Sequence, residues 1–359
     1  MFEYLVPQAP DAIMALMEAC KADTRTSKVD LGVGVYKDDA GGTPILRAVK
    51  AAEKRMWETQ ATKTYVGTTG SASFRATMLD MMFGEGNPAL EFTASSQAAG
   101  GSGALRLGAE VIKSAAPDAT VWVSTPTWAN HIPLISSADL KMDKYPYYNR
   151  ETLGVDFADM LEHLDKYAKR GDVVLLHGCC HNPTGADLSP AEWDELAPFL
   201  RDRGLTPYID LAYFGLGRGM EEDTYGLRKI LEICPEALVA ASCSKNFALY
   251  RERVGLIAVV CKDAKTRDIA QTHTRPRALI HQKRHLTKTH ACLRQSLGNP
   301  RLDHRAGPDR GRDRVALEVH HHTTNRQNGN RDQPQHPVQQ PHHPKAQQAL
   351  AGFCNRWGC

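Results

Sequence analysis

The sequence predicts an α/β fold, a three-layer sandwich in which helices cover both faces of a mostly parallel β-sheet. Three observations support this prediction. Between about residues 100 and 261, segments with helical spacing alternate with short apolar runs, as in helix-covered parallel sheets. The polar and glycine-rich motifs follow the apolar runs, where open α/β sheets bind ligands. The chain has 359 residues, which is enough for one large domain and a smaller one.

The first hundred residues predict an extended arm followed by three helices. Pro7 and Pro10 keep residues 1–10 extended. Apolar residues then recur at helical spacing from Asp11 to Ala22, with Asp11 near the N-cap. The other elements expected in this part are a loop over residues 38–42, a helix that begins after Pro44 and a helix over residues 71–82.

From residue 102 onward the predicted helices and strands alternate regularly. The helices carry apolar residues at three- and four-residue spacing, and the strands are short, mostly apolar runs. Strands of this composition are typical of parallel sheets that are buried on both faces. The expected helices cover residues 102–114, 157–170, 190–203 and 226–233. The expected strands cover residues 120–123, 173–177, 207–211 and 238–242, and a further apolar run covers 254–261.

Composition and charge exclude several classes of protein. The formal net charge of +3 favours neither nucleic acid nor a membrane as partner. No run reaches the roughly 18 apolar residues that span a bilayer, and the start of the chain lacks a secretory signal. The nine cysteines show no Cys-x-x-Cys spacing, and the adjacent Cys179 and Cys180 are poor ligands for one tetrahedral metal site. We therefore expect a cytoplasmic protein with free cysteines and no bound metal.

The segment Ser242–Gly255 carries the residues with the clearest chemistry. Lys245 follows one apolar run and Arg253 precedes the next, so two neighbouring strands would place both at the mouth of one cleft. A partly desolvated lysine near other cations has a lowered pKa and a nucleophilic amine. The hydroxyls of Ser242 and Ser244 and the planar guanidinium of Arg253 suit a phosphate dianion. An amine beside a phosphate clamp indicates pyridoxal 5'-phosphate, and a surface lysine in a basic loop is the alternative.

Three earlier segments carry residues that suit the same cofactor. Asp210, at the end of an apolar strand, is the acid that a pyridinium nitrogen needs, and Tyr213 offers a hydrogen bond to the phenolic oxygen of the ring. The glycine-rich segment Gly100–Leu105 begins a helix whose free N–H groups and dipole form an anion site. The segment His181–Gly185 follows a strand, although its Asn-Pro and Thr-Gly pairs are by themselves ordinary turn chemistry.

Taken in this order, the motifs resemble those of the class I pyridoxal-phosphate aminotransferases, specifically the aspartate and aromatic-amino-acid aminotransferase family. The resemblance covers about residues 1–265 and implies a fold-type I transferase. It implies that Lys245 bonds to the cofactor aldehyde and later moves the proton, and that Asp210 pairs with the pyridine nitrogen. It also implies that Tyr213 and Asn182 contact the phenolic oxygen. The residues that it assigns to the phosphate and its surroundings are Gly101, Ser102, Gly103, Ser242, Ser244 and Arg253.

Four residues match the family more loosely. Trp128 resembles the aromatic residue that stacks on the cofactor ring, and His131 lies where a histidine supports the aspartate; core packing is the alternative for both. Tyr65 resembles a tyrosine that reaches the phosphate of the neighbouring subunit. Gly34 matches a glycine loop over the substrate, so we expect Gly34, Trp128 and Asn182 to contact substrate. These matches imply a homodimer with a shared active site.

The last quarter of the chain differs abruptly in composition. Residues 266–359 contain 11 of the 15 histidines, and 16 lysines and arginines against 6 acidic residues. Apolar periodicity fades, so this segment cannot bury enough surface to offset its chain entropy. Three hypotheses compete: a disordered basic tail that binds polyanions, a metal-binding tract around His320–His322, and a stretch read in the wrong frame. We favour the third.

The sequence therefore predicts three parts and one reaction. Residues 1–40 form an arm and part of a small domain, residues 41–265 form the large cofactor-binding domain, and residues 266–359 form the atypical tail, which leaves the small domain incomplete. The expected reaction is transamination of aspartate or an aromatic L-amino acid with 2-oxoglutarate. No arginine lies in a recognisable motif for the substrate carboxylates. The alternatives are a catalytically impaired cofactor-binding protein and β-elimination or decarboxylation on the same fold.

Overall fold

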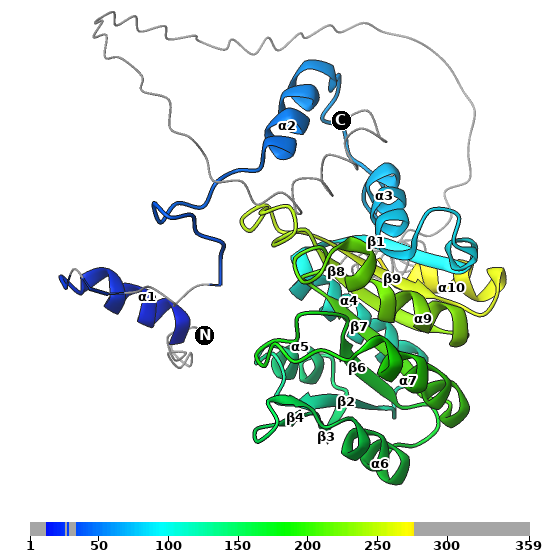
Figure 1. Cartoon of the computed structure of the whole chain (residues 1–359). Helices are drawn as coiled ribbons and strands as arrows, with labels where there is room; N and C mark the ends of the chain where they lie inside the picture. The colour runs from blue at the N-terminus through cyan, green and yellow to red at the C-terminus, as the bar shows by residue number, and fades with distance from the viewer. Residues whose placement is uncertain (1–11, 26, 29–33, 276–359) are drawn as a thin grey trace, which may run out of the picture. The chain divides into compact units, whose positions relative to one another are not determined.

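A seven-stranded sheet forms the centre of the computed structural model, which describes residues 12–25, 27–28 and 34–275 (Figure 1). Its strand order is β1-β9-β8-β7-β6-β2-β3. β9 pairs antiparallel with both β1 and β8, and the other pairs are parallel, so the sheet is mostly parallel as predicted. The strands are β1 (Thr93–Ala99), β2 (Thr120–Thr125), β3 (Lys141–Pro146), β6 (Val173–His177), β7 (Thr206–Leu211), β8 (Ala237–Ser242) and β9 (Val254–Val260). A separate hairpin joins β4 (Tyr148–Asn149) and β5 (Gly154–Val155).

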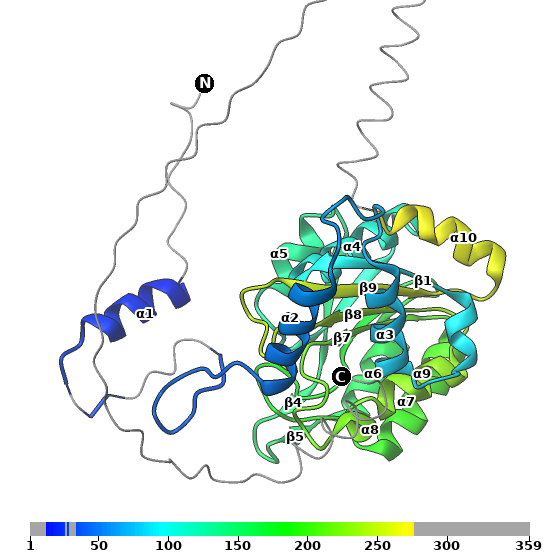
Figure 2. The same cartoon turned by 90° about the horizontal axis from the view of Figure 1, so that it is seen from above.

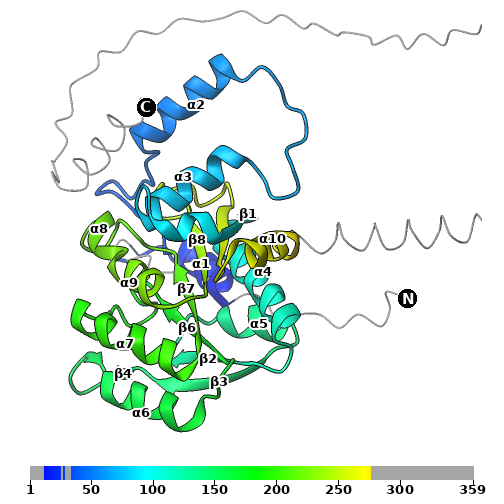
Figure 3. The same cartoon turned by 90° about the vertical axis from the view of Figure 1, so that its right-hand side faces the viewer.

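Helices cover both faces of this sheet, which confirms the predicted three layers (Figure 2). One apolar cluster joins the sheet to the helices α4 (Gly100–Ala115) and α5 (His131–Ser136), with α10 (Ala264–His273) packed beside them. The second cluster lies on the opposite face, under α3 (Ala72–Phe83), α6 (Phe157–Tyr167), α7 (Pro190–Arg203) and α9 (Tyr225–Ile233). Figure 3 shows the two helix layers from the side. Two short helices, η2 (Pro88–Phe92) and α8 (Met220–Asp223), lie in the connections between these elements.

Two strands that the sequence analysis did not predict lie at the edges of the sheet. β1 has the sequence TASSQAA, in which small polar side chains replace the apolar run expected of a strand. It is nonetheless mostly buried, because small side chains fit against α10 and α3. β3 has the sequence KMDKYP, and its two lysines and its aspartate are exposed, as suits an edge strand protected by charge. Neither strand carries the apolar pattern on which the prediction depended.

The predicted boundary after residue 265 lies inside α10, so the fold continues further than expected. The Asp263 side chain caps this helix by accepting a hydrogen bond from the Thr266 amide at 2.7 Å. Gln271 exchanges two hydrogen bonds with the backbone of Ser95 in β1, at 3.1 and 2.9 Å. Thr274 is fully buried. Residues 276–359 of the predicted tail, and the predicted arm over residues 1–10, lie outside the described residues.

The two N-terminal helices form where the apolar spacing predicts them. They are α1 (Ala12–Ala22) and α2 (Arg47–Thr59). No residue of α2 is buried, and its Met56 and Trp57 side chains are exposed. The apolar side of α2 therefore remains open in the described part of the chain. Among the helices of that part, none is both long enough and apolar enough to cross a membrane.

Candidate active site

A cavity of about 170 Å³ opens where β6, β7 and β8 end and α4 begins. Ligands of open α/β sheets bind at this end of the strands because the following loops carry polar residues. We call it the cofactor cavity. The residues predicted from sequence that line it are Gly101, Ser102, Trp128, Asn182, Asp210, Tyr213, Ser242, Ser244, Lys245 and Arg253.

Three residues predicted for the site do not line this cavity. Gly103 lies further along α4, and a Cβ there would lie 3.2 Å from the Ala99 side chain. Gly34 has open space around it, and the Tyr65 side chain is fully exposed. The role expected of Tyr65 concerns a second subunit, so a single chain does not test it. Gly103 packs against Ala98 and Ala99, in the turn that precedes α4.

The cavity also contains residues that the sequence analysis did not assign to it. His177 is the last residue of β6 and lines the cavity. A polar residue at the end of an apolar strand is a pattern from which the sequence analysis could have assigned His177 to the site. Cys179 and Tyr250 line it as well. The Tyr250 hydroxyl accepts a hydrogen bond at 3.0 Å from the backbone N–H of Tyr36, far away in the sequence. No local pattern predicts such a contact.

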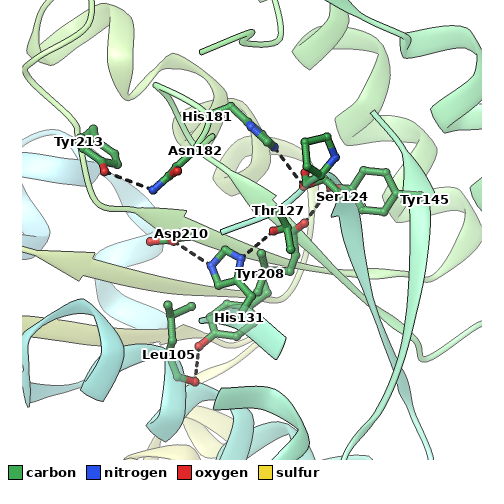
Figure 4. A network of polar contacts seen from close by, with 12 residues as sticks. Leu105, Ser124, Thr127, His131, Tyr145, His181, Asn182, Tyr208, Asp210 and Tyr213 are labelled. Carbon is green, nitrogen blue, oxygen red and sulfur yellow. Dashed lines mark hydrogen bonds and ion pairs between the residues drawn. The ribbon is translucent and has the colours of Figure 1, made fainter. Parts of the chain in front are cut away.

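The Asp210 carboxylate is held from behind by a buried histidine (Figure 4). His131 is fully buried, and its Nε2 lies 3.0 Å from Asp210 Oδ2. Its Nδ1 lies 2.8 Å from the Thr127 hydroxyl, which donates to it when Nε2 carries the proton for Asp210. His131 therefore fixes the orientation of the carboxylate toward the cavity.

Two further histidines pack behind this pair and remain neutral near pH 7. Burial, with His181 and His131 nearby, holds the pKa of His177 well below its usual value. Burial also lowers the pKa of His181 to about 4, with a smaller contribution from His131. Neither ring nitrogen of His177 has a hydrogen-bond partner within the described part of the chain. His177 thus contributes a neutral imidazole to the lining of the cavity, in which Asp210 is the one carboxylate among the described residues.

Lys245 presents a partly desolvated amine to the cavity. Its Nζ lies 4.7 Å from the centre of the Tyr213 ring. Burial lowers the pKa of Lys245, Asp210 opposes this effect and Arg253 adds to it. Burial raises the pKa of Tyr213, and the nearby Asp210 raises it further, so the Tyr213 hydroxyl remains protonated. The Asn182 amide donates to that hydroxyl at 3.4 Å.

The start of α4 and the residues beside it form a cradle of hydrogen-bond donors. Ala99, at its N-cap, makes no side-chain capping bond, so the first N–H groups of the helix remain free for an anion. Gly100 has φ +68°, and a Cβ there would lie 2.7 Å from Nη2 of Arg253. The Ser242 hydroxyl bonds to Ser244 Oγ at 2.8 Å beside these groups. Among the described residues, no carboxylate lies within ion-pair distance of Arg253.

This set of groups fits pyridoxal phosphate. The donor cradle suits a phosphate dianion, because helix N–H groups, hydroxyls and a guanidinium all bind phosphate oxygens. The amine of Lys245 suits the aldehyde, and the buried Asp210 carboxylate suits a protonated ring nitrogen. A glycine at position 100 leaves room for Arg253 to reach the cradle.

Comparison with known proteins agrees with this geometry. The family model described as aminotransferase class I and II matches residues 26–292, which extends past the limit of residue 265 expected from the motifs. The chain is 52% identical to an aromatic-amino-acid aminotransferase of Paracoccus denitrificans over 74% of this chain and 67% of that protein. It is 43% identical to an aspartate aminotransferase of Haemophilus influenzae over 77% and 70% of the two chains.

Solved structures match the fold as well. An aromatic-amino-acid aminotransferase from Burkholderia pseudomallei, covalently bound to pyridoxal phosphate, superposes with a TM-score of 0.74 and 36% identity. An aromatic amino acid aminotransferase with 3-indolebutyric acid gives a TM-score of 0.74 and 51% identity. Each match covers 77% of this chain and 69% of the other. The chain therefore belongs to the class I and II aminotransferases, which depend on pyridoxal phosphate.

Proposed function

We propose that the chain transfers the amino group of an aromatic L-amino acid or of aspartate to 2-oxoglutarate, with pyridoxal phosphate bound in the cofactor cavity. One observation carries this proposal. A desolvated amine, a histidine-supported carboxylate and a set of donors that suits a phosphate line one cavity. The relatives named for aromatic amino acids, aspartate and tyrosine support this choice of substrates.

Each cavity residue has a distinct task in this reaction. Bound pyridoxal phosphate supplies the electron sink for the charge left when a proton leaves the substrate Cα. Lys245 takes that proton and returns it, and its lowered pKa increases the fraction of neutral amine available for this step. Asp210 keeps a proton on the ring nitrogen, and His131 holds Asp210 in place.

The other residues bind and orient. Tyr213 and Asn182 would hydrogen-bond to the phenolic oxygen of the cofactor, and Trp128 would pack its aromatic face against the ring. Asn182 and Trp128 also contact the substrate, beneath the segment that contains Gly34. The proposed phosphate ligands are Gly101, Ser102, Ser242, Ser244 and Arg253, with Gly103 in the first turns of the same helix.

We further propose that the active protein is a homodimer. The exposed Tyr65 then reaches the phosphate site of the partner subunit, as the resemblance implies. The exposed Met56 and Trp57 of α2 supply apolar surface for such contacts. Analytical ultracentrifugation should give twice the chain mass of 39.6 kDa, and a monomer under conditions that support activity would contradict the proposal.

A second candidate function is cofactor binding without efficient turnover. Within the described residues, Arg253 is the arginine that lines the cavity, and it belongs to the proposed phosphate cradle. No second arginine there is positioned for a substrate carboxylate. This observation favours an enzyme that binds pyridoxal phosphate but holds amino acids weakly.

One experiment separates these functions. The purified chain is titrated with pyridoxal phosphate, and its visible absorption is followed before and after addition of L-tyrosine, L-phenylalanine or L-aspartate. Transamination predicts a cofactor band that shifts with amino acid, and glutamate formation when 2-oxoglutarate is added. A cofactor band that does not change when amino acid is added would support cofactor binding without efficient turnover. Release of ammonia or carbon dioxide in place of glutamate would instead identify elimination or decarboxylation.

A further inference from the structure

Two adjacent cysteines and an aspartate converge outside the proposed catalytic machinery. The Sγ atoms of Cys179 and Cys180 and a carboxylate oxygen of Asp223 lie within 4.8 Å of one another. Cys179 and Asp223 are buried, and Cys180 is partly exposed. Neighbouring side chains of an extended segment point in opposite directions. Here Cys180 has φ +49°, a left-handed conformation that bends the chain, and both thiols approach the same carboxylate.

The surroundings of this cluster are acidic and held in place by the backbone. Asp187 accepts the amide hydrogens of Cys180 and His181 at 2.7 and 2.8 Å. Asp223 accepts the amide hydrogens of Gly215, Gly217 and Arg218 at 2.8 to 2.9 Å. In the described part of the chain, no lysine, arginine or histidine side chain forms an ion pair with either carboxylate.

A second, smaller cavity adjoins the cluster. Its volume is about 20 Å³, enough for one water molecule or one ion. Cys179, Asp187, Glu222 and Asp223 line it, with Arg218 as the cationic residue of the lining. Three carboxylates and a thiol around a space of this size favour a cation over an anion.

We propose that Cys179, Cys180 and Asp223 bind one thiophilic divalent cation, such as Zn²⁺ or Cd²⁺, with the fourth position open to the small cavity. Thiolate and carboxylate are the ligand types that such ions take in tetrahedral sites. The sequence predicted no metal site because adjacent cysteines rarely share one ion. The left-handed turn at Cys180 removes that obstacle. Binding releases the protons of both thiols.

The bound ion would affect the cofactor cavity through the loop that carries Cys179 and Cys180. Cys179 lines both cavities. Asn182 follows Cys180 by two residues and donates to the Tyr213 hydroxyl at 3.4 Å. An ion that draws the two thiols together shifts this loop, so we expect it to weaken the binding of pyridoxal phosphate. This inhibition rests on the proposed function, whereas the binding of the ion does not.

The test is a titration of the reduced full-length chain with cadmium chloride. The readouts are the near-ultraviolet cadmium–thiolate absorption band and proton release, and the many histidines of residues 266–359 do not produce that band. We expect a saturable band with one equivalent of Cd²⁺. Cys180→Ser should remove most of the band and weaken binding by about 10- to 100-fold or more. Cys234→Ser, which changes a buried thiol just after α9 that donates to the Ala197 carbonyl, serves as the control and should leave both unchanged.

Asp223→Asn provides an independent variant, which should weaken cadmium binding while both thiols remain. If this variant unfolds, Cys180→Ser decides alone, since Cys180 is partly exposed and its loss leaves the packing intact. A band that persists in Cys180→Ser at the original affinity would overturn the proposal, because the cadmium would then occupy other cysteines. A cadmium site that forms in a chain without aminotransferase activity would leave the metal proposal standing and the proposed function rejected.

Discussion

Burial of the Lys245 amine destabilises the folded chain, and the same burial gives the amine the lowered pKa that its predicted chemistry requires. Burial lowers its pKa, so the folded chain holds the charged form less well than the unfolded chain does. For a lysine whose folded pKa is lowered, this cost is fully present below the folded pKa. It disappears as the pH rises through that value toward the usual 10.5.

Replacing Lys245 by methionine should therefore stabilise the cofactor-free chain. Methionine retains an apolar stem of similar length and removes the buried charge. We expect a higher melting temperature than for the unmodified chain near pH 7, and a difference that shrinks as the pH approaches 10. Thermal unfolding at a series of pH values measures this. An equal melting temperature at every pH would show that the amine bears no burial cost.

Asp210→Ala should reduce turnover far more than cofactor binding. The variant keeps the residues of the proposed phosphate cradle but loses the carboxylate that we propose holds the ring-nitrogen proton. We expect kcat to fall by about 10²-fold or more, the size typical of losing one group that stabilises developing charge. Asp194→Ala, on the exposed side of α7, serves as the control. Bound cofactor with near-normal half-reaction rates in Asp210→Ala would refute this role.

At the scale of elements, the ends of the strands determine where the residues of the candidate site lie. The patterns predicted β6 and α7 with their observed bounds, and β7 and β8 within one residue. Because those strands ended correctly, the positions of Asp210, Ser242 and Lys245 at one edge of the sheet followed. β1 and β3 escaped prediction, since burial of small polar side chains and an exposed charged edge leave no apolar pattern.

The start of α4 lies so close to β9 that only glycine fits between them. A Cβ on Gly255 would lie 2.5 Å from the Gly100 carbonyl oxygen and 2.8 Å from that of Ala241, both backbone atoms. Gly255→Ala should therefore lower the free energy of unfolding by about 1–3 kcal/mol and weaken cofactor binding, because α4 must shift. Gly67→Ala, with open space around it, should change neither. Denaturant unfolding of both variants measures this, and equal stabilities would contradict the close packing.

At the scale of the whole molecule, contacts between distant segments were beyond prediction. The bond from Tyr36 to Tyr250 and the approach of Asp223 to Cys179 join parts of the chain that share no local pattern. The pairing of Asp210 with His131 was anticipated only through resemblance to a family. Periodicity indicates which face of an element is buried, but not which loop meets which.

The hypothesis of a changed reading frame also belongs to this scale. α10 packs on the sheet and Thr274 is buried, so we expect such a change beyond Thr274 rather than at residue 266. Mass spectrometry of the protein expressed from its natural gene tests it. The hypothesis predicts that peptides such as those around His320 are absent. Their detection would establish that the protein contains residues 276–359 as given in its sequence, and would reject the hypothesis.

We propose that Lys245 bonds to pyridoxal phosphate in the cavity between α4, β7 and β8. Reduction of the chain with borohydride in the presence of the cofactor, followed by peptide mapping, tests it most directly. We expect one modified peptide, which carries the added mass on Lys245 and is missing in Lys245→Ala. Modification spread over exposed lysines, with Lys245 unmodified, would contradict it.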